Sequence, residues 1–395
     1  MLLVRFPWID YRSDELAHLD TYNALLNSKE AALDDGGSFV LPVMSFNVRL
    51  DGLEKNPNNH FTKRVDRLKA VIERWKPSIA GLQEPYGEQM AHIMRYMPSN
   101  YRVIGTHASL QEDSDTSKPN SIPMKRTPDD FQTAILYDVE KLKLLEHDYL
   151  WLSTTPRVPY SKNWDSQGVR TLNIARFEIR GKDQELIAFN SHLDVRSEEA
   201  RREQAKIVAK TIREWREKYP NALVTLTADF NSAPGQTTHR ILTSEDALVD
   251  SWDRCTNIAA DGTCVTNNVA STFHGWIGSW TNTYLARFLS YVAFTVHAMG
   301  MNFPNHPPTT FSDLTSILFD KARYTFHYSV AESLPQFPPT RFHVDWVLFG
   351  NSENAWIEPK MVIVADVKDV DFSSDHFPVV AALSINKKRQ EKSHK

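Results

Sequence analysis

The sequence has no long run of uncharged apolar residues. No segment reaches the ~18 such residues that a transmembrane helix needs, and the apolar start of the chain, residues 1–10, is interrupted by Arg5, Pro7 and Asp10. This start also lacks the apolar core and the small-residue cleavage site of a signal peptide. We therefore expect a cytoplasmic protein without a membrane span.

An excess of basic charge is also absent. The 395 residues carry a formal net charge of −4, whereas a general nucleic-acid binder usually shows a strong basic excess. Long duplex DNA is therefore a less favoured partner, although a local basic cleft is not excluded. The composition, 41% hydrophobic and 24% charged, is normal for a soluble globular protein.

Cysteine is scarce, because the chain contains only Cys255 and Cys264. These two residues flank Asp261-Gly262, which is a turn signal, so a hairpin disulfide is geometrically possible. Such a bond would matter only in an oxidising compartment. We expect two free thiols.

The apolar patterning predicts helices packed outside two stacked sheets. Amphipathic helical stripes cover residues 62–76 and 198–217, and a shorter helix is expected at 237–243. The expected strands are many and are often apolar throughout. Those that matter for the site cover residues 39–48, 79–82, 186–190, 222–227, 342–349 and 379–383.

The chain divides into a main domain with additions. Residues 1–38, with a polar helix and a loop, read as a leader, and the domain covers 39–385. Residues 107–130 form a long polar loop, either mobile or facing the substrate. An insertion at about 277–340 is expected to be a lid or a helical subdomain, with a peripheral membrane contact as the alternative. Residues 386–395 form a basic tail.

Candidate metal ligands and an imidazole lie at the ends of apolar strands. Asp375 and His376 precede the last strand, and Glu84 ends an early one. Carboxylates are hard oxygen ligands suited to Mg²⁺ or Mn²⁺, and the proton of a histidine moves near pH 7. Asp345 lies inside an apolar strand, and a buried acid needs a partner. His376 is the obvious candidate.

Three further strand ends carry polar side chains. Asn47 can coordinate a metal-bound water or a phosphate, or it simply turns the chain. His192 and Asp194 are two residues apart, so they face the same side of an extended chain, and Asp194 is a further candidate for binding the phosphate. Asp229 and Asn231 share that spacing, and a carboxylate beside an amide can hold an attacking water next to a metal ion.

Two residues outside these strand ends are candidates for binding the substrate. Arg170 can offer a forked cation to a phosphate, with a surface salt bridge as the alternative. Trp164 can shape a pocket for a small ligand by stacking, with core or rim packing as the alternative.

The ordered set of motifs resembles the endonuclease/exonuclease/phosphatase superfamily, which has the deoxyribonuclease I-like fold. Each motif alone is weak, but six in the right order are specific, and the match runs from about residue 40 to 385 without the insertion. The motifs are Ser45-Phe46-Asn47, Leu82-Gln83-Glu84, Asn190-Ser191-His192, Ala228-Asp229-Phe230-Asn231, His343-Val344-Asp345-Trp346 and Ser374-Asp375-His376.

One branch of the superfamily is more similar, namely small microbial metal-dependent hydrolases without a single agreed substrate. The stretches that carry this likeness are Thr155-Pro156, 161–165, Arg170, 192–196, 199–201 and 272–275. Ser191 stands where many relatives carry Thr, and Ala228 where most carry Gly. Neither departure removes a catalytic group.

The resemblance implies a fold and a set of roles. The fold would be α+β, a four-layer α/β/β/α sandwich of two packed mixed sheets with outer helices. Glu84 would bind the divalent metal, with Asp375 and Asn47 beside it. Asp229 would orient or deprotonate the attacking water, and Asn231 would hold the phosphate. His192 and His376 would contact the scissile phosphate. Asp345 would fix the tautomer of His376, and Arg170 would add positive charge near the phosphate.

These observations predict a phosphoesterase that depends on Mg²⁺ or Mn²⁺ and uses direct attack by water. The sequence has no G-x-S-x-G and no P-loop pattern, which fits a mechanism without a serine nucleophile. The expected partner is a phosphorylated substrate of unknown class, and the protein is expected to be a monomer. The alternatives are a nuclease acting on single strands and a catalytically inactive binding module.

Overall fold

A computed structural model of the chain describes most of the domain. The described residues are 11–30, 38–51, 54–85, 87–106, 133–244, 248–259, 264–276, 278–282 and 343–387. The loop predicted at 107–130, most of the insertion predicted at 277–340 and most of the tail predicted at 386–395 lie outside this part of the chain. The lid, membrane-contact and tail expectations therefore stay predictions.

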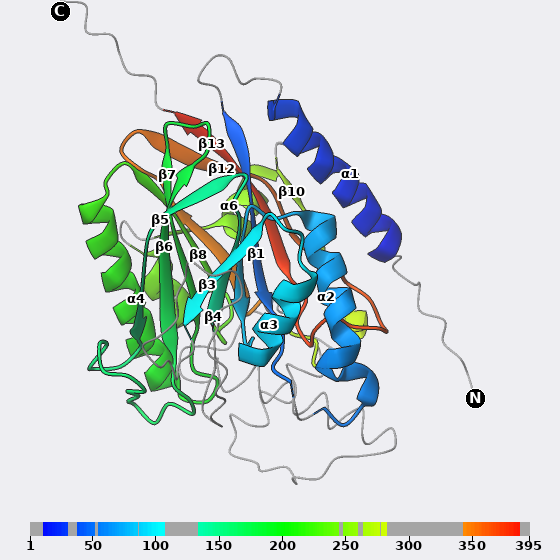
Figure 1. The fold of residues 1–395 in the computed structure, drawn as a ribbon, viewed down its shortest axis with the longest axis horizontal. Coiled ribbons are helices and arrows are strands. Elements are labelled where there is room, and N and C mark those ends of the chain that lie inside the picture. The colour runs from blue at the N-terminus through cyan, green and yellow to red at the C-terminus, as the bar shows by residue number, and fades with distance from the viewer. Residues whose placement is uncertain are drawn as a thin grey trace, which may run out of the picture.

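The strands form two mixed sheets (Figure 1). In spatial order, the first sheet contains β10 (Val265–Thr266), β12 (Ala355–Val364), β13 (Val379–Lys387), β1 (Phe39–Asn47), β2 (Ile79–Gln83), β4 (Thr133–Asp138) and β3 (Tyr101–Thr106). In spatial order, the second sheet contains β5 (Leu142–Trp151), β6 (Thr171–Ile179), β7 (Glu185–His192), β8 (Ala222–Asp229), β11 (Asp345–Gly350) and β9 (Val249–Asp250).

Helices cover the outer faces of both sheets (Figure 1). The first sheet carries α1 (Tyr11–Glu30), α2 (Phe61–Trp75) and α3 (Gly87–Tyr96), and the second carries α4 (Glu198–Lys218) and α5 (Thr237–Thr243). The shorter elements are η1 (Pro57–Asn59), α6 (Ser251–Ala259) and η2 (Gly278–Asn282). None of the described helices has the length and apolar character needed to cross a membrane.

Alternation along the strands explains the layers. Leu41, Val43 and Ile79 of the first sheet face Phe177 and Val347 of the second in one buried cluster between the sheets. The residues in between point outward and pack against the helices. Strands that are buried on both faces read as continuous apolar runs. The predicted four-layer α/β/β/α sandwich of two mixed sheets is confirmed.

Helix α2 shows how the local sequence sets one of these layers. Val65, Leu68 and Ile72 lie on one face at helical spacing, and all are buried against the first sheet. The helix ends at Lys76, which adopts a left-handed conformation with φ 40° and precedes Pro77, a residue that cannot continue a helix.

The expectation of two free thiols is wrong. Cys255 of α6 and Cys264 at the start of β10 form a disulfide, with a Cα–Cα distance of 5.3 Å. Both residues are buried in the cluster between the sheets. The backbone brings the two side chains within bonding distance, a proximity that the nine-residue spacing permits but does not require.

The topology brings the polar strand ends to one end of the sandwich. Strand β1 is parallel to β2, and β7 is parallel to β8, so their carboxyl ends coincide within each sheet. Strand β11 is antiparallel to β8 and begins with Asp345 opposite Asp229. Strand β13 is antiparallel to β1, which brings the residues before Val379 to the same end.

A buried polar layer joins the two sheets just below this end. The side-chain amide of Gln83 in β2 donates to Asn190 Oδ1 in β7 at 2.8 Å, and Thr227 Oγ1 in β8 donates to the same oxygen at 3.2 Å. Gly81 makes this approach possible, because a Cβ there would lie 1.9 Å from Thr227 Oγ1. The sheets are therefore in direct polar contact beneath the polar strand ends.

Candidate active site

One carboxylate oxygen, Asp229 Oδ2, is the centre of the polar cluster. Asn47 Nδ2 donates to it at 2.9 Å, while His192 Nε2 lies 3.6 Å and His376 Nε2 3.8 Å away. Burial and the neighbouring charge of Asp345 raise the pKa of Asp229 to about 7. A carboxylate with such a pKa can accept a proton near neutral pH.

His376 is held between two acids. Its Nδ1 lies 2.9 Å from Asp345 Oδ2, so Asp345 is the partner that the sequence suggested for this imidazole. Burial lowers the pKa of His376, but the facing carboxylates, Asp345 first, outweigh it and raise the value to about 10. The ring is therefore an imidazolium at neutral pH, and its Nε2–H points toward Asp229.

His192 is neutral, in contrast to His376. Burial lowers its pKa well below the ordinary value, and the positive charges of Arg170 and His376 lower it further. Asn231 Nδ2 lies 2.9 Å from His192 Nε2, so a neutral ring accepts this hydrogen bond. Asn231 also donates its backbone N–H to Asp229 Oδ1 at 2.9 Å. These hydrogen bonds thus hold the ends of β7 and β8 in a fixed position relative to each other.

A second group of charges lies beside the cluster. Arg49 Nε lies 3.6 Å from Asp375 Oδ2, and Arg49 Nη1 lies 3.8 Å from Glu84 Oε2. The same Nε donates to Glu54 Oε1 at 2.8 Å. Asn47 links this group to the centre, because its Nδ2 donates to Glu84 Oε1 at 3.1 Å as well as to Asp229.

The hydrogen bonds of Asn47 fix its place in the cluster, and its predicted role as a metal or phosphate contact stays a prediction. Its amide oxygen accepts the backbone N–H of Arg49 at 2.9 Å, and its amide nitrogen orients two acids. In this arrangement the side chain holds Glu84 and Asp229 in place.

Three residues of the site have a left-handed backbone, namely Arg49 (φ 56°), Glu84 (φ 64°) and Asn231 (φ 48°). Such conformations cost energy for residues other than glycine and persist only where the surroundings impose them. Here hydrogen bonds impose them, since Leu50 N–H donates to Glu84 Oε2 at 3.2 Å and Asn231 N–H donates to Asp229. The strain indicates that these side chains are pre-positioned.

Two predicted phosphate contacts, Arg170 and Asp194, face each other in the interior, and their role toward a phosphate stays a prediction. The side chain of Arg170 is fully buried and faces Asp194, with Nε 3.8 Å from Oδ2. Asp194 accepts hydrogen bonds from Ser166 Oγ and from three backbone N–H groups, of Gln167, Arg196 and Ser197. A carboxylate engaged in this way orders the loop after β7, and Arg170 acts on the site through its charge on His192.

Trp164 lies in the same loop region, not in the polar cluster. Its ring is half-buried, its φ is 57°, and its carbonyl accepts a hydrogen bond from Ser197 Oγ at 2.7 Å. The stacking role proposed for it stays a prediction.

Arg64 of α2 is a residue that the sequence analysis missed. It is fully buried, and it donates to the backbone carbonyls of Asn59, Val48, Arg49 and Ser373 at 2.6–3.1 Å. It thereby ties the loop after β1 to the loop that carries Asp375 and His376. The available signal was an arginine on the apolar stripe of α2, where a buried charge needs a reason.

The segment before η2 supports the same loop. Thr272 Oγ1 accepts the backbone N–H groups of Val344 and Asp345, and His274 N–H donates to the carbonyl of Asp375 at 2.9 Å. Phe273 pairs with His376 through an isolated bridge. This explains why the stretch 272–275, which the sequence analysis used only for the resemblance, lies at the site.

The donor set fits a divalent cation. Glu84, His192 and Asp229 offer ligand atoms within 4.8 Å of one another, whereas in the group of Asp229, Asp345 and His376 the imidazolium leaves only the two carboxylates as ligands. Mutual repulsion contributes to the raised pKa of Asp229, and a positive charge placed here would relieve it. The guanidinium of Arg49 near Glu84 and Asp375 offsets part of the negative charge at this position.

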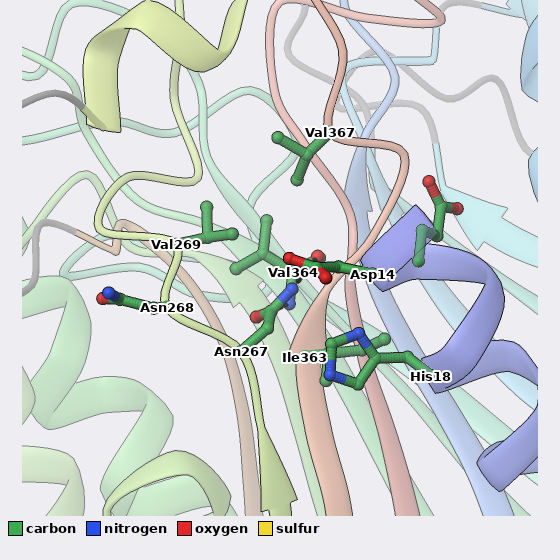
Figure 2. Close-up of a pocket in the computed structure, with 9 residues that line it drawn as sticks. Asp14, His18, Asn267, Asn268, Val269, Ile363, Val364 and Val367 are labelled. Carbon is green, nitrogen blue, oxygen red and sulfur yellow. Dashed lines mark hydrogen bonds between the residues drawn. The ribbon is translucent and has the colours of Figure 1, made fainter. Parts of the chain in front are cut away.

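A cavity of about 240 Å³ lies elsewhere, between α1, strand β12 and the segment that follows β10 (Figure 2). It is lined by Asp14, His18 and Asn267 among others, and none of its lining residues belongs to the cluster around Asp229. The site is therefore identified by its polar groups and not by this cavity.

Comparison with solved structures places the chain among known folds. A protein of the endonuclease/exonuclease/phosphatase family from Bacteroides thetaiotaomicron aligns with a TM-score of 0.59, 20% identity, and 91% and 98% of the two chains covered. The chain has the endonuclease/exonuclease/phosphatase fold. The sequence itself matches no protein-family model and no curated protein.

Two further structures with this fold differ in what they act on. A mannosyl-6-phosphatase from B. thetaiotaomicron aligns with a TM-score of 0.58 and 20% identity, covering 87% of this chain and 99% of its own. TDP2 from D. rerio, in a complex with a single-stranded DNA product, aligns with a TM-score of 0.52 and 16% identity, covering 87% and 98%. At these levels of sequence identity, the similarity shows a shared fold alone.

Proposed function

We propose that the protein is a divalent-metal-dependent phosphoesterase that hydrolyses a phosphorylated substrate by direct attack of water. The observation that carries the proposal is the convergence of Asp229, Asp345 and His376 with Glu84 and Asn47 at one end of the sandwich. They come from both sheets and are buried together, although burial of so many polar groups opposes folding.

Each side chain has a chemical task in this proposal. Asp229 accepts a proton from the attacking water, because its pKa of about 7 leaves it partly ionised at neutral pH. The backbone N–H of Asn231 and the side-chain amide of Asn47 hold the orientation of Asp229. The imidazolium of His376 donates its Nε2 proton toward a phosphoryl or leaving oxygen, and Asp345 keeps the ring oriented.

Glu84 and Asp375 would hold the metal ion, with Asp229 beside them. A bound Mg²⁺ or Mn²⁺ supplies positive charge that offsets the negative charge of the phosphoryl group. Carboxylate oxygens are the ligands that these hard cations prefer. This assignment makes activity depend on added metal and sensitive to a chelator.

The test is hydrolysis of a panel by purified protein with Mg²⁺ or Mn²⁺, with and without EDTA. The panel holds p-nitrophenyl phosphate, bis-p-nitrophenyl phosphate, mannose 6-phosphate, inositol phosphates, sphingomyelin, and single-stranded RNA and DNA. Metal-dependent cleavage of one class supports the proposal and names the substrate type. Silence from folded protein across the panel would favour the inactive binding module.

The single-strand nuclease is the second candidate. The alignment with a structure that holds a single-stranded DNA product favours its inclusion, whereas the net charge of −4 favours a smaller substrate. Competition between mannose 6-phosphate and an oligonucleotide for one metal-dependent activity would distinguish them.

A further inference from the structure

The guanidinium of Arg49 lies where a cation would contact the proposed metal ligands. It faces Asp375 at 3.6 Å and Glu84 at 3.8 Å, and these two carboxylates come from different parts of the chain. Their side chains are only 6% and 9% exposed, while that of Arg49 is 28% exposed. Arg49 thus offsets two buried negative charges from the open side of the site.

The backbone of Arg49 is fixed, so its side chain is aimed at these acids. Its N–H donates to Asn47 Oδ1 at 2.9 Å, and its carbonyl accepts from Arg64 Nη2 at 3.1 Å and from Gln89 Nε2 at 2.8 Å. Its φ of 56° is left-handed. The strained and fully hydrogen-bonded backbone explains why the guanidinium lies where it does.

The contacts of the guanidinium are unequal. Its Nε donates to Glu54 Oε1 at 2.8 Å, a hydrogen-bonded ion pair. The distances to Asp375 and Glu84 are beyond hydrogen-bonding reach and reflect charge attraction alone. The contacts with Asp375 and Glu84 are therefore weaker than the bond to Glu54, and they are the ones that a metal ion would displace.

We propose that Arg49 is a built-in competitor for the divalent cation: it neutralises Glu84 and Asp375 in the metal-free protein and must give way when the metal ion enters. This inference rests on the proposed function, because it assumes that Glu84 and Asp375 hold the metal ion. Metal binding then breaks two charge contacts of Arg49, and it also places a second cation near the guanidinium. Both effects weaken metal affinity, so Arg49 sets the metal concentration at which the site fills.

The test is isothermal titration of EDTA-treated, dialysed protein with Mn²⁺. Arg49→Gln is expected to bind Mn²⁺ about tenfold more tightly than the wild type, the size of a typical coupling between neighbouring charged groups. Arg49→Lys keeps the charge and is expected to stay close to the wild type. Arg67→Gln is the matched control, because Arg67 pairs with Asp371 at 3.2 Å and with no proposed ligand among the described contacts.

A second measurement covers the case in which a variant is less stable. Each protein is melted with and without Mn²⁺, and the gain in melting temperature is taken from its own metal-free baseline. The gain is expected to be larger for Arg49→Gln than for the wild type. Equal or weaker Mn²⁺ binding by Arg49→Gln, with wild-type binding intact, would overturn the role of Arg49 alone. Absence of Mn²⁺ binding by the wild type and all variants would overturn both this role and the proposed function.

Discussion

At the scale of single residues, neighbouring groups of the candidate site have different protonation states. Asp229 has a raised pKa of about 7, His376 a raised pKa of about 10, and His192 a strongly lowered pKa. All three are buried, so desolvation acts on each of them. The neighbours decide the outcome, because Asp345 stabilises the imidazolium of His376 while Arg170 opposes a charge on His192.

Replacing Asp229 with Asn is expected to lower kcat about 10²–10⁴-fold, because the amide cannot accept a proton from water. The amide keeps only one of the two oxygens that accept hydrogen bonds from Asn47 and Asn231, so some stability is also lost, and thermal unfolding checks that the variant is folded at the assay temperature. Steady-state kinetics on the substrate found with the panel measure the effect. Asp371→Asn is the control, since the Asp371 side chain is 70% exposed and pairs with Arg67. Near-normal turnover by Asp229→Asn would contradict the role given to Asp229.

The pair of Asp345 and His376 predicts a pH dependence of stability in the metal-free protein. Because the pKa of His376 is raised in the folded state to about 10, the pair stabilises the fold fully below the ordinary histidine pKa of about 6.5. This stability is lost as the pH rises through about 10. Asp229, with a pKa of about 7, is already ionised above about pH 8. Its titration therefore does not contribute to the change in stability between about pH 8 and pH 10.

Urea unfolding in EDTA between about pH 8 and pH 10 tests this dependence. The wild type is expected to lose stability with a slope of at most about 1.4 kcal/mol per pH unit, the limit for one proton. Asp345→Asn is expected to show a flatter profile, because its His376 lacks the facing charge. Parallel profiles for the two proteins would show that the pair does not carry the shift.

At the scale of secondary-structure elements, the disulfide joins α6 to β10 at the edge between the sheets. Both cysteines are buried among core residues such as Trp252 and Val269. Strand β10 leads directly into the segment 272–275, which carries backbone hydrogen bonds to Asp345 and Asp375. The disulfide thus helps to hold the segment 272–275, which supports the loop that carries Asp375 and His376.

Reduction of the disulfide is expected to lower the free energy of unfolding by about 2–3 kcal/mol, the size for a loop of this length. The measurement is guanidinium unfolding with and without dithiothreitol. The double variant Cys255→Ser with Cys264→Ser should be less stable than the wild type and indifferent to the reductant. An unchanged wild-type midpoint under reducing conditions would contradict the prediction.

The same bond bears on the compartment. Structural disulfides persist in oxidising compartments and are rare in the cytosol. The disulfide therefore weighs against the cytoplasmic expectation drawn from the N-terminal sequence. Alkylation and mass spectrometry of protein taken directly from its native cells would show whether the two cysteines are paired there.

At the scale of the whole molecule, the two sheets are held close together beneath the active end. Gln83, Asn190 and Thr227 connect the sheets through buried hydrogen bonds, and Gly81 leaves the room for them. The side chains of the candidate site come from both sheets. The distance between the sheets therefore sets the distances within the site.

Gly81→Ala is expected to destabilise the fold by about 1–3 kcal/mol, the usual cost of overpacking a core. The added methyl group would lie 1.9 Å from Thr227 Oγ1 and 2.5 Å from Asn190 Oδ1, so the sheets must separate. Chemical unfolding measures the loss. In the Gly81→Ala, Thr227→Gly double variant the cost is expected to be smaller than the sum of the single costs. Additive costs would show that the clash with Thr227 is not the cause.

Much of the fold and of the site followed from local patterns. The stripes of α2 and α4, the short helix α5 and the apolar strands were predicted close to their observed bounds, because burial of a repeating apolar face depends on nearby residues. The order of polar strand ends pointed to Asp229, Asp345 and His376. These residues are polar where an apolar strand ends, which is visible without a structure.

What only the tertiary structure decided depends on how separate segments of the chain meet. The Cys255–Cys264 bond, the backbone carbonyl partners of Arg64 and the position of Arg49 between Glu84 and Asp375 follow from how segments meet after the sheets have packed. The same packing buried Arg170 and engaged Asp194, which sequence reasoning had placed on the phosphate. Local patterns determined which residues could react, and the close packing of two sheets decided which of them face one another, because charge and hydrogen bonding act over a few ångströms.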